Sequence, residues 1–100
     1  MIAVNDADVM QALKAVNDPE IGINIVDLGL VYRAERKPEG IEVALAVTTP
    51  SCPLGDMLVE EAREVLRSLF PDAPSVRVEL VRSPPWSPDR MSEAARRQLD

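Results

Sequence analysis

Cys52 is the only cysteine of the chain and lies in the segment TTPSCPLGDM, between a predicted strand and a predicted helix. A cysteine beside a helix N-terminus meets unpaired backbone N–H groups and the positive end of the helix dipole, which together lower the pKa of its thiol. The hydroxyl groups of Thr48, Thr49 and Ser51 could donate to a thiolate or to a bound group. The alternative is structural, because free cysteine is also among the most buried residue types.

Three carboxylates, Asp18, Glu20 and Asp27, fall within one predicted loop. Paired carboxylates can carry out acid–base chemistry or hold a hard metal ion. Their spacing alone favours a structural interpretation, in which Asp18 caps the turn opened by Pro19 and Asp27 accepts from local backbone N–H groups.

Trp86 stands in the stiff segment PPWSP. Tryptophan is enriched at the energetic centres of protein interfaces, so Trp86 and the neighbouring Pro85 form a candidate partner-binding surface. An equally open alternative is that Trp86 clamps the final helix onto the sheet.

The composition limits the chemistry that these residues can support. The chain has no histidine, which excludes Ser–His–Asp and Cys–His arrangements and disfavours a self-contained zinc site. The segment DLGLVY lacks the G-x-G-x-x-G pattern of dinucleotide-binding folds, and no P-loop is present. A net charge of −6 and only three aromatic residues argue against nucleic acid or an anionic membrane surface as a partner. The composition therefore indicates no conventional enzyme, while a thiol-dependent step stays open.

The cysteine count and the hydropathy pattern predict the compartment. A single cysteine cannot form an intrachain disulfide, which fits a reducing environment. No apolar run approaches the ~18 residues that a membrane span requires. The first ten residues have no basic region ahead of an apolar stretch, so we expect no signal peptide and a cytoplasmic protein.

Hydrophobic periodicity predicts the elements that position these residues. Alternation indicates strands at 30–36, 41–48 and 76–81, and helical spacing indicates helices from Asn5 or Asp6 to about Val16, from Pro53 to near Phe70, and from Ser87 or Ser92 to Leu99. Residues 17–28 form an ordered loop with buried isoleucines, and Gly29 permits a turn or bulge before the first strand.

The order α-β-β-α-β-α predicts a two-layer α+β fold for one domain over residues 1–100. In this fold, helices cover one face of a small three-stranded mixed sheet, formed by an antiparallel hairpin and a right-handed parallel crossover.

Three segments, DPEIGINIVDLGLVY, TTPSCP and PPWSPDRMSEAAR, together resemble signatures of the MIP18 family, also called DUF59. The resemblance runs in the same order from about residue 8 to residue 96. It implies a fold related to iron–sulfur cluster assembly domains and a role in maturing or inserting Fe–S clusters. It also implies that Cys52 is the reactive or ligating thiol, with Asp18, Glu20, Asp27, Thr48 and Thr49 around the same pocket. The chain lacks the terminal extensions of SufT-like and PaaD-like members, so we expect a minimal single-domain member.

The leading hypothesis is an accessory factor in Fe–S cluster assembly or Fe–S protein maturation, which acts through protein contacts and a transient thiol step at Cys52. A cluster normally has four cysteine ligands, of which Cys52 supplies one. We therefore expect no stable cofactor, and a transient Fe–S cluster or iron shared in a homodimer, with a scaffold or client protein, or with a small thiol. Two alternatives stay open. One is a thiol-dependent enzyme or persulfide carrier that uses Cys52, and the other is a structural adaptor of a multicomponent oxygenase or metabolic enzyme complex that docks through Trp86.

Overall fold

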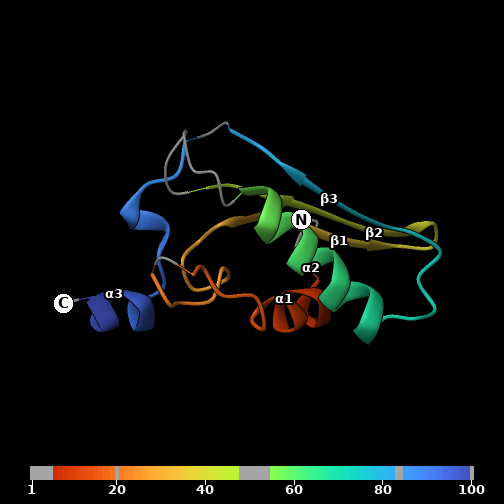
Figure 1. Cartoon of the computed structure of the whole chain (residues 1–100), viewed down its shortest axis with the longest axis horizontal. Helices are drawn as coiled ribbons and strands as arrows, with labels where there is room; N and C mark the ends of the chain where they lie inside the picture. Colours follow the sequence, from red (N-terminus) through yellow and green to blue (C-terminus); the bar gives the residue numbers. More distant parts are fainter. Residues whose placement is uncertain (1–5, 20, 48–54, 83–84, 100) are drawn as a thin grey trace.

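The computed structural model describes residues 6–19, 21–47, 55–82 and 85–99, and it contains both helices and strands. The elements are α1 (Ala7–Leu13), β1 (Val31–Lys37), β2 (Gly40–Leu45), α2 (Gly55–Leu69), β3 (Val76–Leu80), a 3₁₀ turn (Pro88–Arg90) and α3 (Glu93–Leu99). The predicted order of helices and strands is confirmed (Figure 1).

The three strands form one mixed sheet in the order β1-β2-β3. β1 pairs antiparallel with β2, and β2 pairs parallel with β3 through the crossover that contains α2, so both predicted connections are present. The β1–β2 register shifts between Val31 and Arg33, which places a bulge at Tyr32. Gly29, which was predicted to permit a turn or bulge before the first strand, lies in a turn with φ of +78°, so the first of these alternatives is confirmed.

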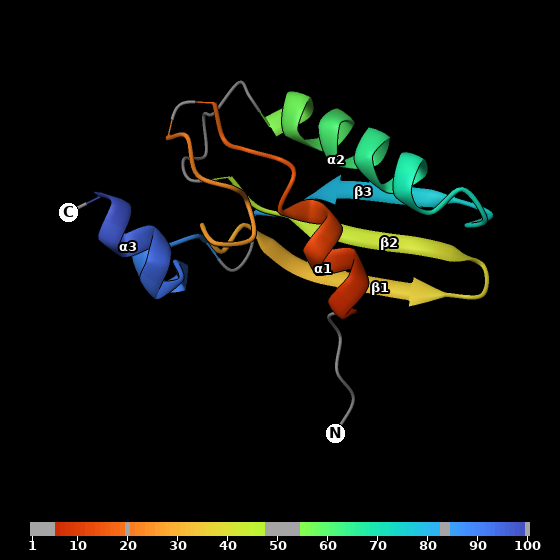
Figure 2. The same ribbon diagram turned by 90° about the horizontal axis from the view of Figure 1, so that it is seen from below.

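The two faces of the sheet differ because successive side chains of a strand point to opposite sides. Ala34, Val43 and Val78 are register neighbours, and all three are buried on the face that α1 and α2 cover (Figure 2). The opposite face carries charged side chains from all three strands, namely Arg33, Glu35, Lys37, Glu42, Arg77 and Glu79. The predicted α+β architecture is therefore confirmed, with one charged and one apolar face on the sheet.

One hydrophobic cluster joins the sheet, the helices and the loop that precedes β1. α2 contributes Leu58, Ala62 and Leu66 at helical spacing, all of them buried. The loop contributes Ile23, Ile25 and Leu28, which are buried as predicted, whereas Ile21 and Val26 are only partly buried. α3 lies at the end of the molecule beside this loop rather than over the sheet (Figure 2).

Several predicted boundaries need correction. Asp6 caps α1, but the helix ends at Leu13, because i→i+3 bonds tighten the following turn, including the bond from the Val16 N–H to the Leu13 carbonyl (3.0 Å). β2 ends at Leu45 and not at residue 48. α3 begins after Ser92, which confirms the second of the two predicted cap positions. No helix in the described ranges is long and apolar enough to cross a membrane.

Candidate functional site

The candidate site lies at the end of the sheet where β1 begins and where β2 and β3 end. This arrangement follows from the topology, since β1 is antiparallel and β3 parallel to β2. The Ala46 N–H donates to the Leu30 carbonyl (2.8 Å), and the Val81 N–H donates to the Leu45 carbonyl (2.8 Å). These bonds join the loop before β1 and the segments after β2 and β3 at one end of the molecule.

Asp18 stabilises the first half of the loop. Its side chain is only 4% exposed, and its Oδ1 accepts from the Ile21 N–H at 3.3 Å. Its backbone carbonyl accepts from the Gly22 N–H (2.7 Å), and its own N–H donates to the Ile23 carbonyl (3.0 Å). The interpretation of Asp18 as the cap of the turn opened by Pro19 is therefore confirmed.

Asp27 stabilises the second half of the loop through Asn24. The Asn24 side-chain amide donates to Asp27 Oδ2 (2.7 Å), and the Asp27 N–H donates back to Asn24 Oδ1 (2.9 Å). The carboxylate was expected to accept from backbone N–H groups, and it accepts instead from this side-chain amide. Asn24 was missed in the sequence, although its position three residues before an aspartate is a recognisable Asx pattern.

The segment around Trp86 is fixed on residues 27–29 of the same loop. The Trp86 indole N–H donates to the Leu28 carbonyl (2.7 Å), and the Ser92 N–H donates to the Asp27 carbonyl (2.7 Å). A Cβ added to Gly29 would lie 2.2 Å from the Arg90 carbonyl oxygen, so only glycine permits this approach. Trp86 is half-buried and contacts the core, whereas Pro85 is exposed. The clamp that the sequence suggested therefore acts on the loop and not on the sheet.

Arg90 and Tyr32 extend this contact to the bulge of β1, and neither was identified from the sequence. The Arg90 guanidinium lies over the Tyr32 ring, 4.5 Å from its centroid. The Tyr32 hydroxyl oxygen is buried and has no hydrogen-bond partner among the residues that the structure describes. A cation–π contact between residues 58 positions apart leaves no local pattern in the sequence, which explains why it was missed.

Cys52, Thr48, Thr49, Ser51 and Glu20 lie outside the described residues. The residues that flank residues 48–54 are neighbours, since a Cβ added to Gly55 would lie 3.3 Å from Val47 Cγ1 and 2.8 Å from Leu80 Cδ1. Val47 follows Ala46, the residue after β2 whose N–H donates to the Leu30 carbonyl. The segment that contains Cys52 is therefore connected at both ends to the end of the sheet that carries the candidate site.

The described residues contain no group of three or more cysteine or carboxylate side chains that could hold a metal ion. Asp18 and Asp27 are each engaged by neighbours in their own half of the loop. In the described part, the loop before β1 and the C-terminal segment are bonded to each other at the end of the sheet where β2 ends.

This topology, with loops 17–30 and 85–92 joined at the ends of β2 and β3, defines a small α+β domain with a three-stranded mixed sheet. The family model described as "Iron-sulfur cluster assembly protein" matches residues 6–80. The chain therefore belongs to this family, also known as DUF59, as its three motifs indicated.

Two curated relatives and one solved structure illustrate the similarity. "Fe-S protein maturation auxiliary factor YitW" of Bacillus subtilis (strain 168) is 38% identical over 90 residues, which cover 89% of this chain and 87% of that protein. "Fe-S protein maturation auxiliary factor SufT" of Staphylococcus aureus (strain USA300) is 40% identical over 82 residues, which cover 81% and 92%. The crystal structure of a DUF59 domain from Bacillus anthracis superposes with a TM-score of 0.88 at 34% identity and covers 92% of this chain and 88% of its own.

Proposed function

We propose that this chain is an accessory factor in Fe–S cluster assembly or Fe–S protein maturation, which acts through protein contacts and a transient step at the Cys52 thiol. Family membership and the names of the two curated relatives support the role. The observation that carries the proposal is the bonding of residues 85–92 to residues 27–29. It joins two of the three family motifs at the end of the sheet where β2, the strand before the third motif, ends. The single cysteine and the absence of an intrachain disulfide favour the cytoplasm as its compartment.

In this proposal the cluster or iron is cargo. A cluster normally takes four thiolate ligands, and this chain supplies one. The remaining ligands come from a scaffold or client protein, from a second copy or from a small thiol. We propose Glu20, Thr48, Thr49 and Ser51 as the residues that act with the Cys52 thiol, while Asp18 and Asp27 hold the two halves of the loop before β1.

The decisive comparison is between wild type, Cys52→Ser and the control Ser68→Ala, which changes an exposed serine of α2. Each protein is purified anaerobically and given iron and sulfide, and each is tested for its ability to support maturation of an Fe–S enzyme in the native host. We expect Cys52→Ser to lose iron–sulfide binding and client maturation, while Ser68→Ala retains both. The proposal fails if wild type binds neither iron nor sulfide and Cys52→Ser leaves client maturation intact.

A second candidate, a persulfide carrier or thiol enzyme, rests on the position of Cys52 three residues before Gly55, the first described residue of α2. A helix N-terminus lowers the pKa of a nearby thiol and so makes it a better nucleophile. The alkylation rate of Cys52 measured against pH distinguishes this candidate. An apparent pKa near the ordinary value of ~8.5 would argue against it.

The adaptor hypothesis concerns the exposed part of the Trp86 segment. Trp86 is half-buried and Pro85 is exposed, so this segment leaves surface available to a partner. For an adaptor, Trp86→Ala abolishes capture of the partner from the native host while Cys52→Ser has no effect. For a maturation factor, Cys52→Ser has the larger effect on client maturation.

A further inference from the structure

Residues 85–99, which we call the strap, are bonded to the rest of the described chain through the loop before β1. The Trp86 indole N–H donates to the Leu28 carbonyl (2.7 Å), and the Ser92 N–H donates to the Asp27 carbonyl (2.7 Å). The other hydrogen bonds of the strap within the described residues are internal, among them those from the N–H groups of Arg90, Met91 and Arg96 to the carbonyls of Ser87, Pro88 and Ser92. Two hydrogen bonds between described residues therefore join the strap to the loop.

The strap buries little of its own apolar surface. Met91 and Ala95 lie in the hydrophobic cluster, and Trp86 packs against it. From residue 93 to residue 98, every side chain except that of Ala95 is exposed. α3 has seven residues, which is too few for a helix that is stable in isolation, since such helices need about 12–15 residues. α3 therefore keeps its helical structure only while the strap is docked.

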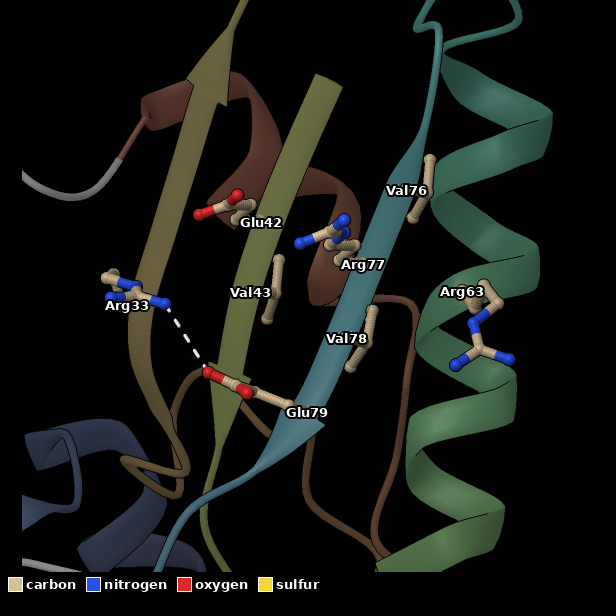
Figure 3. A pocket seen from close by; sticks show the side chains of 8 residues that line it. All are labelled: Arg33, Glu42, Val43, Arg63, Val76, Arg77, Val78 and Glu79. Carbon is tan, nitrogen blue, oxygen red and sulfur yellow. Dashed lines mark hydrogen bonds and ion pairs between the residues drawn. The ribbon is translucent and has the colours of Figure 1, made fainter. Parts of the chain in front are cut away.

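The sheet and α2 are connected to each other without the strap. Arg33 of β1 reaches across β2 to Glu79 of β3 (3.5 Å), and both residues line the groove of ≈ 370 Å³ shown in Figure 3. None of the residues that line this groove belongs to the strap. Val43 and Val78 pair in register and are buried on the face that α1 and α2 cover. The loss of the contacts of the strap therefore leaves the contacts between the strands and α2 in place.

The docked strap covers a tyrosine whose hydroxyl group has no hydrogen-bond partner among the described residues. The Arg90 guanidinium lies over the Tyr32 ring, 4.5 Å from its centroid, and the hydroxyl oxygen is closed off from solvent. A buried hydroxyl without a partner has lost its hydrogen bonds to water, and it regains them when water reaches it. Once Arg90 leaves the ring, this face of Tyr32 is open to water. The unsatisfied hydroxyl is therefore a cost of the docked state.

We propose that the strap opens from the loop as one unit, at a lower free energy than global unfolding, and that the unsatisfied Tyr32 hydroxyl favours the open form. Opening breaks both hydrogen bonds to the loop, and α3 unfolds. The open form exposes the Tyr32 ring and the carbonyls of Asp27 and Leu28, at the end of the sheet where the candidate site lies. The strap is thus a cover that controls access to this loop. The proposal rests on packing and does not depend on Cys52, so its test is independent of the proposed function.

Native-state hydrogen exchange in low concentrations of urea tests whether the strap opens before the sheet. The reporters are the amides of Met91, Ser92 and Arg96. The reference amides are those of the β2–β3 ladder, among them that of Ile41, which donates to the Ser75 carbonyl (2.9 Å). We expect the three strap amides to share one protection factor, at least about tenfold below that of the reference amides. Because opening exposes less surface than global unfolding, exchange in the strap should also depend less on urea.

The role of the hydroxyl group is tested by Tyr32→Phe, which removes the unsatisfied group and keeps the ring under Arg90. We expect Tyr32→Phe to slow the exchange of the strap amides about fivefold, because the docked state no longer carries the cost of the buried hydroxyl. Trp86→Phe, which loses the bond to the Leu28 carbonyl, should speed this exchange about fivefold. The control Ser87→Ala removes a hydroxyl of the strap that makes no cap bond, and it should change the exchange less than about twofold.

Cooperativity within the strap is tested by Ser92→Ala. Ser92 Oγ accepts from the Ala95 N–H (3.1 Å), so the substitution weakens α3 directly. If the strap is one unit, exchange at Met91, which precedes α3, speeds up about fivefold, by the same factor as exchange at Arg96. An acceleration restricted to Arg96 would show that α3 frays by itself and would overturn the proposal.

Two further results would overturn the proposal. If the strap amides are protected as strongly as those of the β2–β3 ladder, the strap and the sheet unfold together. If Tyr32→Phe leaves the exchange of the strap unchanged or speeds it, the hydroxyl does not favour the open form. Circular dichroism confirms that each variant is folded, and if Trp86→Phe does not fold, Tyr32→Phe and Ser92→Ala still decide between the outcomes.

Discussion

Trp86 stabilises the candidate site through one hydrogen bond and through apolar packing, and the two contributions can be separated. Trp86→Phe removes the bond to the Leu28 carbonyl and keeps most of the apolar surface, so we expect a loss of about 1 kcal/mol in the free energy of unfolding. Trp86→Ala removes both, and we expect about 3 kcal/mol. Urea denaturation followed by circular dichroism measures both losses, because this is the only tryptophan and its fluorescence is absent from the variants. The control Leu69→Ala changes a residue that is 58% exposed and should cost less than about 0.5 kcal/mol.

Gly29 and Gly22 form a matched pair that separates backbone strain from close contact. Both have positive φ, +78° and +81°, but a Cβ at Gly29 meets the Arg90 carbonyl, whereas a Cβ at Gly22 meets nothing within 4 Å. We expect Gly22→Ala to cost about 1 kcal/mol of stability and Gly29→Ala about 3 kcal/mol or more. The difference is read from the urea midpoints of the two variants. Equal costs would show that residues 85–92 do not pack tightly against the loop.

At the scale of elements, the serines before the last helix differ in their role. Ser92 Oγ accepts from the Ala95 N–H (3.1 Å) and caps α3, whereas Ser87 makes no side-chain cap bond to the 3₁₀ turn. We expect Ser92→Ala to lower stability by about 1 kcal/mol and to speed amide exchange in α3. Ser87→Ala should do neither. A similar effect of both substitutions would contradict the assignment of Ser92 as the cap.

The elements of the fold could be predicted from the sequence because their signals are local. Alternation in VRVEL and the helical spacing of Leu58, Ala62 and Leu66 each depend on residues a few positions apart. The end of α1 was placed too late, because Val16 continues the apolar spacing while its backbone is in a tight turn. The bonds from Trp86 to Leu28 and from Ser92 to Asp27 connect residues far apart in sequence, and no periodicity encodes such pairs. The sequence therefore predicted which motifs matter, and only the structure shows which of their atoms meet.

At the scale of the whole molecule, the C-terminal segment belongs to the same core as the region that the family model covers. The model matches residues 6–80, yet Met91 and Ala95 are 9% and 1% exposed within the single hydrophobic cluster. Trp86 also covers the loop residue Leu28. The described residues 85–99 are therefore part of the structural unit and not an appendage to it.

A chain that ends after Arg82 tests this conclusion. It loses the contacts of Met91, Ala95 and Trp86 and leaves the loop around Leu28 exposed, so we expect at least about 3 kcal/mol less stability and a melting temperature lower by more than about 10 °C. The control ends after Gln98, removes only the last two residues and should melt within about 2 °C of the full chain. Thermal unfolding followed by circular dichroism gives both values. Hydrogen exchange should show the loss of protection first in residues 25–30, since these pack against the removed segment. If the truncated chain melts like the full one, the loop holds its conformation without the C-terminal segment. The arrangement of the family motifs then does not depend on that segment.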